Sequence, residues 1–297
     1  MRILVTGKNG QVVTALKAFG GGHEIITLGR PKVDLARPLT LRAPVMAIRP
    51  DIILSVAAYT QVDMAETEAD TAHVVNAEAP AALARLAKET GIPIIHLSTD
   101  YVFDGAKSSA YVEEDPIAPL NIYGATKSEG EKAIIAETDN HVILRTSWVY
   151  SPYGRNFVKT MLALAESRDT VNVVADQYGC PTSAIDIARH LIRIAEKAVA
   201  SDRADLRGIF HLAAPDEATW AQFAEAIFAD YERRNHRRVT VLPIPSSAYP
   251  TPAKRPVNSR LDSGKLLSVY GLSLHPWRQA LDEVLEHLYA SDTEPVT

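Results

Sequence analysis

The sequence begins MRILVTGKNGQVV (residues 1–13), and this stretch decides the fold. Residues 2–6 form a short apolar run that ends at Gly7, which predicts a strand buried on both faces. A helical pattern starts at about Gln11, directly after a second glycine. A glycine turn between the first strand and the first helix is typical of folds that bind dinucleotides.

The same apolar pattern recurs along the first half of the chain. Further runs predict buried strands at residues 23–29, 51–58, 92–98 and 141–150, and helical patterns such as residues 69–91 separate them. Continuous apolar strands that alternate with helices indicate a parallel sheet covered on both faces. We therefore predict the α/β class, with a doubly wound, Rossmann-like parallel sheet and a smaller C-terminal substrate-binding lobe.

The organisation of the chain changes near residue 150. Residues 1–150 are expected to form the dinucleotide-binding domain, and a strand near residues 208–214 is expected to return to its sheet and complete it. Residues 151–297 are expected to form mainly the substrate-binding lobe, which is then discontinuous in sequence. Within the lobe, residues 176–183 predict a turn and residues 243–259 a proline-rich loop.

Composition bounds the classes of partner. The chain has 297 residues, 46% of them hydrophobic, and a net charge of −5, which is typical of a globular protein and argues against nucleic acid as the main partner. Its one cysteine, Cys180, excludes an intramolecular disulfide and fits a reducing compartment. The sequence shows neither a signal peptide nor an apolar run of the ~18 residues that a membrane span needs. We predict a cytoplasmic protein without a membrane partner.

The glycines after the first strand fit a phosphate-binding loop. Gly7 can make the tight turn, and Gly10 can let the backbone approach a pyrophosphate at the helix N-terminus. Val13 replaces the third glycine of the usual fingerprint. Because that glycine normally permits close packing of helix and strand, Val13 predicts a slightly displaced helix and an intact phosphate site.

The end of the second strand bears on the choice of cofactor. NAD-binding folds carry an Asp or Glu there to bind the ribose hydroxyls, whereas this chain has Gly29 and Arg30. A guanidinium suits the 2′-phosphate of NADPH, so NADPH is predicted and NADH is the alternative. Asp34 either binds the adenine amino group or caps a helix, and the sequence does not decide between these roles.

A second pattern places reactive side chains near the carboxyl ends of the strands, where doubly wound sheets bind ligands. Ser98 and Thr99 close one strand, and Tyr123 and Lys127 follow at the expected start of a helix. A spacing of four residues puts the tyrosine and the lysine on one helix face. The set predicts a hydroxyl, a phenol and an ammonium around a nicotinamide.

These residue types suit the reduction of a ketone, which delivers hydride to carbon and a proton to oxygen. Tyr123 is the predicted proton donor. The ammonium of Lys127 is expected to lower the pKa of the phenol and to bind the ribose hydroxyls of the cofactor. Thr99 is expected to hydrogen-bond the carbonyl oxygen and orient it.

Eight motifs together resemble one family. They are GKNGQV (7–12), AAYTQVDMAE (57–66), STDYVFDG (98–105), YGATKSEGEKA (123–133), LRTSWVY (144–150), GRNF (154–157), DQYGCPTS (176–183) and YPTPAKRPVNSRLD (249–262). This pattern resembles the dTDP-4-dehydrorhamnose reductases, of the extended short-chain dehydrogenase/reductase superfamily, nearly from end to end. The Tyr-x-x-x-Lys pair is shared across the superfamily, whereas STDYVFDG and TPAKRPVNSRLD are much more particular to these reductases.

The resemblance implies an activity and a set of site residues. The implied reaction is NADPH-dependent reduction of the C4 ketone of dTDP-4-dehydro-L-rhamnose to dTDP-L-rhamnose, in the biosynthesis of cell-surface polysaccharide. A homodimer is a candidate assembly, but the sequence does not decide the oligomeric state. The implied catalytic residues are Thr99, Tyr123 and Lys127. The implied cofactor contacts are Gly10, Gln11, Val12, Asp34, Leu35, Ala58, Tyr59 and Thr60. The implied contacts to the nucleotide-sugar are Asp100, Trp148, Arg255 and Asn258; without the resemblance, Trp148 would be assigned to the core.

Rival functions share most of these features. A dehydratase or epimerase would have the same fold and the same Tyr-x-x-x-Lys pair, but dehydration needs a second carboxylate after Asp100, where this chain has Tyr101. A non-catalytic binding subunit, like the regulatory subunit of methionine adenosyltransferase, also resembles this family, and the intact catalytic set argues against that role. The sequence contains no His/Cys cluster with ligand spacing, so no metal site is predicted.

Overall fold

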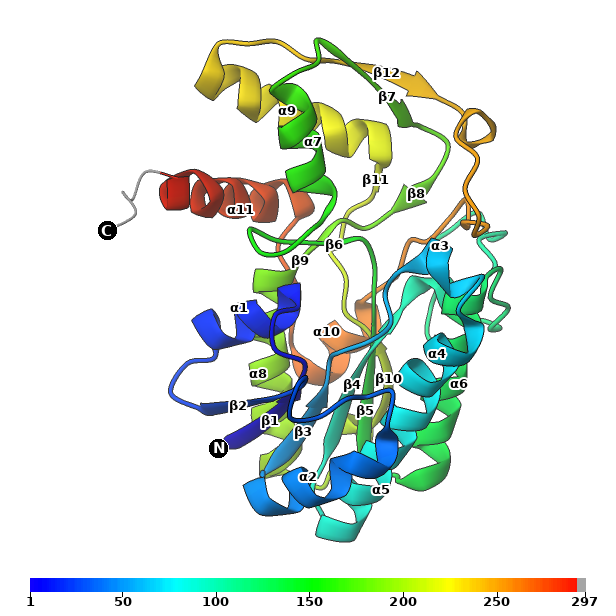
Figure 1. Cartoon of the computed structure of the whole chain (residues 1–297), viewed down its shortest axis with the longest axis vertical. Helices are drawn as coiled ribbons and strands as arrows, with labels where there is room; N and C mark the ends of the chain where they lie inside the picture. The colour runs from blue at the N-terminus through cyan, green and yellow to red at the C-terminus, as the bar shows by residue number, and fades with distance from the viewer. Residues whose placement is uncertain (293–297) are drawn as a thin grey trace.

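The computed structural model describes residues 1–292, which form a sheet domain and an upper lobe (Figure 1). Within these residues, six parallel strands form the sheet in the order β10-β5-β4-β3-β1-β2. Their bounds are β1 Arg2–Thr6, β2 Glu24–Leu28, β3 Ile52–Ser55, β4 Ile94–Thr99, β5 His141–Thr146 and β10 Gly208–His211. The parallel sheet confirms the predicted fold class. Its strand order reverses at β1, where such sheets bind ligands beyond the strand ends.

Helices cover both faces of the sheet, because side chains along each strand alternate between two cores. Ile3 and Val5 pack in one core, and Leu4 packs in the other. The first core includes residues of α1 (Gln11–Phe19), α8 (Ala184–Ala200) and α10 (Gly264–Tyr270). The second includes residues of η1 (Pro38–Leu41), α2 (Arg42–Ile48), α5 (Ala79–Thr90) and α6 (Ile122–Glu137). Burial on both faces explains why the strands are apolar at successive positions.

The helix expected over residues 69–91 is divided in the structure. After α3 (Val62–Ala65) come α4 (Ala69–His73), a π-helical segment η2 (Val74–Glu78), and then α5. The wide turn places Asn76 in the interior, where its side chain bonds the backbone of Tyr59 and the hydroxyl of Thr126. A tertiary contact therefore distorts the helix and fixes the segment that follows β3.

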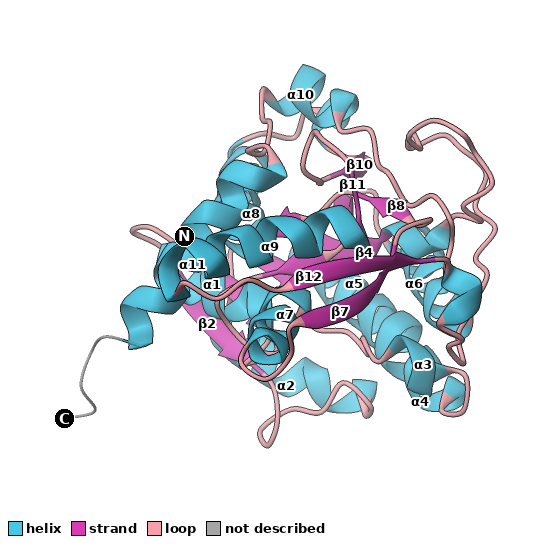
Figure 2. Cartoon of the chain, turned by 90° about the horizontal axis from the view of Figure 1, so that it is seen from above, coloured by secondary structure: helices cyan, strands magenta, loops and turns pink. Residues whose placement is uncertain are grey.

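The upper lobe is built from later segments, and its strand pair β7–β12 packs on α9 (Figures 1 and 2). Its elements are β6 (Val149–Tyr150), α7 (Phe157–Ala165), β7 (Thr170–Val174), β8 (Tyr178–Gly179), β9 (Thr182–Ser183), β11 (Ala218–Thr219), α9 (Trp220–Asn235), β12 (Thr240–Ile244) and α11 (Trp277–Asp292). Short 3-10 turns lie at η3 (Asp100–Val102), η4 (Ala204–Leu206) and η5 (Ser246–Ala248). Residues 176–183, expected as a turn, form β8 and β9 because these segments pair with β11 and β6. No helix in the described part of the chain is long and apolar enough to cross a membrane.

Candidate active site

One cavity adjoins the carboxyl ends of the sheet strands, and a second lies in the upper lobe. The first, which we name the sheet-end cavity, has a volume of about 460 Å³. It is lined by Gly7, Asn9, Gly10, Gln11, Val12, Val13, Val56, Ala57, Ala58, Thr60, Leu97, Ser98, Tyr123, Lys127, Thr146, Val149, Gly154 and Arg155. The second, which we name the lobe cavity, has a volume of about 790 Å³ and lies beneath β7 and β12.

The loop after β1 forms one end of the sheet-end cavity. Gly7 adopts φ +95°, and a Cβ there would lie 3.1 Å from Cβ of Ala57, so both the turn and the close approach favour glycine. Helix α1 begins with Gly10 as its N-cap, without a side-chain cap. The amides of the first turn therefore lack helical acceptors and can bind an anion.

The side chain of Gln11 joins this loop to the opposite wall. Its Oε1 accepts a hydrogen bond from the hydroxyl of Ser151 at 2.8 Å, and its Nε2 donates to the carbonyl of Val149 at 3.4 Å. The segment fixed in this way carries Gly154 and Arg155, both of which line the cavity. Sequence reasoning gave Arg155 no role, although the GRNF motif contains it.

The wall after β3 is held by buried polar side chains. The hydroxyl of Thr6 accepts hydrogen bonds from the amides of Val56 and Ala57, at 2.9 and 3.0 Å. Ala58 and Thr60 line the cavity, as the family pattern implied. Tyr59 is not among the lining residues, because its hydroxyl donates to Glu68 at 2.8 Å on the exposed side.

Helix α6 brings Tyr123 and Lys127 into the same cavity, one turn apart. Asn121 is the N-cap, and its side chain accepts a hydrogen bond from the amide of Gly124 at 2.8 Å. A Cβ at Gly124 would lie 2.1 Å from the carbonyl oxygen of Tyr101. This glycine therefore lets the helix start directly against the end of β4, where Thr99 lies.

Thr99 and Tyr123 are hydrogen-bonded to each other. The hydroxyl of Thr99 also donates to Oδ1 of Asp100 at 2.9 Å. Burial raises the pKa of Tyr123 to about 12, more than the bond with Thr99 lowers it. The expectation that Lys127 lowers the pKa of this phenol is therefore wrong, because burial dominates, and the phenol is protonated at neutral pH.

Lys127 is buried, and its amine has two partners. Nζ donates to the carbonyl of Leu97 at 2.6 Å and lies 2.9 Å from Nε2 of His96. Burial lowers the pKa of Lys127 to about 7, against the charge of Glu131, which raises it. Sequence reasoning missed His96, because a histidine inside a buried strand carries no signal that separates it from the core.

Two buried hydroxyls in this cavity lack partners within residues 1–292. They are Oγ of Ser98 and Oγ1 of Thr146, on the adjacent strands β4 and β5. A buried hydroxyl without a hydrogen bond is unfavourable, so these atoms are suited to a polar ligand group. An amide such as that of a nicotinamide would satisfy both. The residues present therefore fit a dinucleotide.

The predicted residues at the end of β2 do not line the cavity. Arg30 is exposed, and the side chain of Asp34 accepts a hydrogen bond from the amide of Ala36 at 3.0 Å. Asp34 thus caps a turn, which is close to the capping role that the sequence left open. Leu35 packs at the edge of the core beneath α2.

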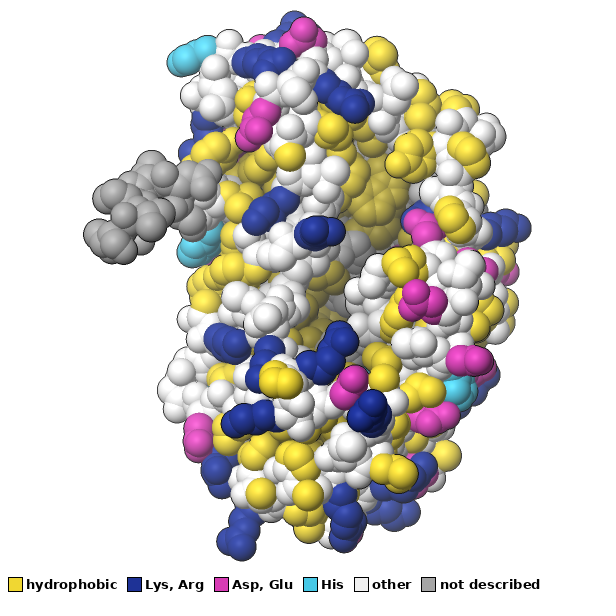
Figure 3. Space-filling view, viewed as in Figure 1, with side chains coloured by type: hydrophobic (Ala, Val, Ile, Leu, Met, Phe, Trp, Pro, Cys, Tyr) yellow, Lys and Arg dark blue, Asp and Glu magenta, His cyan; other side chains and the backbone are white. Residues whose placement is uncertain are grey.

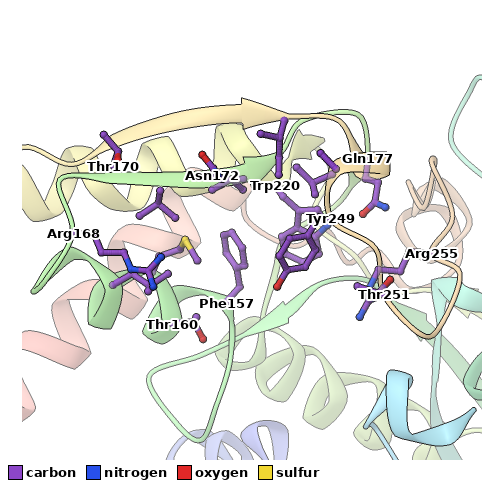
Figure 4. A pocket seen from close by; sticks show the side chains of 17 residues that line it. Phe157, Thr160, Arg168, Thr170, Asn172, Gln177, Trp220, Tyr249, Thr251 and Arg255 are labelled. Atoms are coloured by element: carbon purple, nitrogen blue, oxygen red, sulfur yellow. The ribbon is translucent and has the colours of Figure 1, made fainter. Parts of the chain in front are cut away.

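The lobe cavity is a hollow with a mainly apolar lining, and all its lining residues belong to the upper lobe (Figure 3). The rings of Phe157, Trp220 and Tyr249 lie along it, with Arg168 toward one end and Arg255 at the other (Figure 4). Aromatic faces with a cation at each end suit an elongated, negatively charged ligand that carries a flat ring.

Arg255 lines the lobe cavity and reaches the catalytic tyrosine through one intervening side chain. Its guanidinium forms a bidentate pair with Asp63, at 2.8 and 3.1 Å, and a hydrogen bond with Tyr101. The ring of Tyr101 packs edge-on against Tyr123, with 5.9 Å between centroids. Tyr101 therefore connects the guanidinium of Arg255 to the ring of Tyr123.

The other implied substrate residues lie behind these surfaces. Trp148 is half-buried, adopts φ +46° and stacks on Trp220 with 3.5 Å between centroids. Asn258 is buried and donates to the carbonyls of Lys107 and Ser109. Asp100 is also buried, and burial raises its pKa to about 6. None of these three lines either cavity in the described structure.

The comparison with protein families decides the affiliation. The chain matches the model of the RmlD substrate binding domain over residues 1–290. It belongs to this family. A dTDP-4-dehydrorhamnose reductase from Sinorhizobium fredii is 52% identical over 94% of this chain and 95% of its own length. A second, from Burkholderia thailandensis, is 42% identical over 95% of this chain and 97% of its own.

Solved structures of members of the RmlD family agree. The crystal structure of dTDP-4-dehydrorhamnose reductase from Bacillus anthracis, in complex with NADP, superposes with a TM-score of 0.89. It is 33% identical and covers 96% of this chain and 99% of its own. The two chains therefore share the fold over 96% of this chain and 99% of the other.

Proposed function

We propose that this chain is an NADPH-dependent oxidoreductase that reduces the C4 ketone of dTDP-4-dehydro-L-rhamnose to dTDP-L-rhamnose. One observation carries the proposal: Tyr123 and Lys127 line a cavity fit for a dinucleotide, with Thr99 hydrogen-bonded to Tyr123, and the upper lobe holds a second cavity fit for a nucleotide-sugar. The names of the relatives point to the same reaction.

The sheet-end cavity would hold the cofactor. The turn at Gly7 and Gly10 and the open amides of Gln11 and Val12 would bind the pyrophosphate, and Arg155 would add a positive charge. Ala58 and Thr60 form the adjoining wall, and the free hydroxyls of Ser98 and Thr146 suit the nicotinamide amide. When bound there, NADPH supplies the hydride.

Tyr123 donates the proton in this proposal. Its raised pKa keeps the phenol protonated, which is the state that reduction requires. Thr99 would turn its hydroxyl proton from Asp100 to the ketone oxygen and orient it beside the phenol. The charged form of Lys127 stabilises the phenolate that remains after transfer. Because the pKa of Lys127 is about 7, activity is expected to decline as pH rises and the amine loses its charge.

The lobe cavity would bind the nucleotide-sugar. Its aromatic rings suit the base, and Arg255 and Arg168 suit the diphosphate or neighbouring oxygens. Trp148, Asp100 and Asn258 would act indirectly, by holding the residues and the loop that surround the sugar.

The loop after β2 would set the choice of cofactor. Arg30, with Lys32 nearby, would favour NADPH by binding its 2′-phosphate.

The decisive experiment is turnover of purified protein with NADPH and a panel of 4-keto nucleotide-sugars, followed by the absorbance of the nicotinamide. We expect oxidation of NADPH with dTDP-4-dehydro-L-rhamnose and formation of dTDP-L-rhamnose. A stoichiometric protein partner together with no oxidation on any sugar would favour a non-catalytic binding subunit instead.

The proposal also assigns the two ligands to different parts of the chain. Residues 1–150 with the strand β10 would bind the cofactor, and residues 151–297, of which 293–297 lie outside the described part, would mainly bind the sugar. The cytoplasmic location and the homodimer stay predictions from the sequence, and gel filtration with light scattering would test the latter.

A further inference from the structure

Lys127 belongs to a buried chain of hydrogen bonds that the reaction above does not use. Its Nζ lies 2.9 Å from Nε2 of His96, and Nδ1 of His96 lies 3.0 Å from Oγ of Ser55. The exposed fractions of Lys127, His96 and Ser55 are 1%, 1% and 2%. Such a chain must satisfy its own polar atoms, because water does not reach it.

Three elements converge on this chain. His96 and Ser55 are register partners on the adjacent parallel strands β4 and β3, so the sheet fixes their separation. Lys127 comes from α6, which covers this part of the sheet. The carbonyl of Leu97, next to His96, accepts a second hydrogen bond from the amine. The amine is thus held by two acceptors on one rigid strand.

The chemistry of these groups selects one arrangement of protons. An ammonium donates all its protons, so the ring of His96 accepts at Nε2 and donates from Nδ1 to Ser55. This ring is neutral, in keeping with burial and the charge of Lys127, which hold the pKa of His96 well below its ordinary value. Two N–H groups of Lys127 are then engaged, and the third is left for a group in the sheet-end cavity.

We propose that His96, oriented by Ser55, is a positioning residue that keeps the amine of Lys127 charged and turned toward the cofactor. The chain of bonds ends at Ser55, which is buried, so it positions the amine and does not relay a proton to solvent. The consequence for turnover rests on the proposed function, whereas the consequence for NADPH binding does not.

The titratable groups around the amine come from several elements. They are His96 on β4, Tyr123 and Glu131 on α6, Arg145 on β5, which pairs with Glu131 at 2.7 Å, and Asp100 in η3, which acts on Tyr123. Burial holds the pKa of Lys127 at about 7. Loss of the acceptor His96 would lower the pKa of Lys127 further, because the charged amine would lose a hydrogen bond that stabilises it.

The test is the affinity for NADPH, measured by fluorescence across the neutral and alkaline range, without sugar. Wild type should lose affinity as pH rises through about 7. In His96→Leu, which removes the acceptor, this fall should move about one pH unit to the acid side. His96→Gln retains an acceptor and should keep the wild-type profile. Ser55→Ala should shift the pH at which NADPH affinity falls in the same direction as His96→Leu does, but by a smaller amount.

A matched control is His190→Leu, which removes another buried imidazole, on α8, where both ring nitrogens lie near backbone carbonyls. It should lower thermal stability without moving the pH profile. A wild-type profile in His96→Leu, or a shift in His96→Gln as large as in His96→Leu, would overturn the proposal. If His96→Leu does not fold, Ser55→Ala decides the same question. A protein that binds NADPH but reduces no sugar would refute the proposed function and leave this test standing.

Discussion

Arg255 and Tyr101 connect the lobe cavity to Tyr123 of the sheet-end cavity, yet the chain builds the two cavities in different ways. In the first, the reactive side chains stand on β4 and α6, where ladder and helix hydrogen bonds hold the backbone. The second is formed by aromatic rings and by loop residues such as Tyr249. The difference suggests that the chemistry is fixed by the scaffold, while recognition of the nucleotide-sugar can vary with the loops.

The largest expected effect concerns the sheet-end cavity. Tyr123→Phe removes the proton donor and leaves the ring, so kcat should fall by roughly 10² to 10⁴, the usual contribution of a general acid. NADPH binding should be nearly unchanged, because the phenol is not proposed to hold the cofactor. Steady-state kinetics and a fluorescence titration measure both. Full turnover in this variant would show that Tyr123, on helix α6, is not the proton donor.

The next effect concerns Asp100, which is buried and accepts hydrogen bonds from Thr99 and Ser147. Burial raises its pKa from 3.8 to about 6, so folding is favoured below pH 4 and loses this advantage as pH rises through 6. Asp100→Asn does not ionise, and it should be more stable than wild type by up to about 3 kcal/mol at neutral pH. Urea unfolding at several pH values measures this difference, which should vanish in acid.

Asp63→Asn is the matched control for that experiment. The hydrogen bond from Arg255 lowers the pKa of Asp63, so its charged form is favoured in the fold. This variant should be less stable than wild type above pH 4, and the difference should shrink as pH falls. A gain in stability for both variants at neutral pH would contradict the account of Asp100.

A third effect separates the lobe cavity from the chemistry. Tyr249 is 61% exposed and lines this cavity, so its loss should not disturb the core. Tyr249→Ala should raise KM for the nucleotide-sugar roughly tenfold to hundredfold, since stacking on a base contributes ~1–3 kcal/mol. Both kcat and NADPH affinity should stay close to wild type. Tyr249→Phe keeps the ring and serves as control. A fall in kcat with unchanged KM would contradict the claim that the lobe cavity serves substrate binding and the sheet-end cavity the chemistry.

The smallest effect concerns cofactor choice. Arg30 is exposed, so solvent screens its contact with a 2′-phosphate, and the preference that it confers should be about tenfold at most. The ratio of kcat/KM for NADPH to that for NADH should fall in Arg30→Ala and persist in Arg37→Ala, another exposed arginine of the same loop. Equal values in wild type, or an unchanged ratio in Arg30→Ala, would show that Arg30 does not read the phosphate.

Much of the fold was predictable, because strands buried on both faces leave continuous apolar runs. The runs at residues 2–6, 23–29 and 92–98 became β1, β2 and β4 within a few residues. The π-helical segment was not predictable, because its cause is the distant contact of Asn76 with Tyr59 and Thr126. Local sequence does not encode such a contact.

The candidate site divides in the same way. The turn at Gly7 and the four-residue spacing of Tyr123 and Lys127 depend on the backbone, so they could be predicted from the sequence. All three residues line the sheet-end cavity. The direction of a side chain at a strand end depends on tertiary packing, so the burial of Asp100 and the bond from Lys127 to His96 could not be read from spacing. The sequence also did not reveal that the buried hydroxyl of Thr146 has no hydrogen-bond partner within residues 1–292.

The most direct test of the central claim follows the hydride itself. The protein is supplied with dTDP-4-dehydro-L-rhamnose and NADPH that carries deuterium at C4 of the nicotinamide, and the product is analysed by NMR. The account predicts dTDP-L-rhamnose with deuterium at C4 of the sugar, formed by wild type and greatly slowed in Tyr123→Phe. Absence of deuterium from C4, or a product that forms equally fast in both proteins, would contradict it.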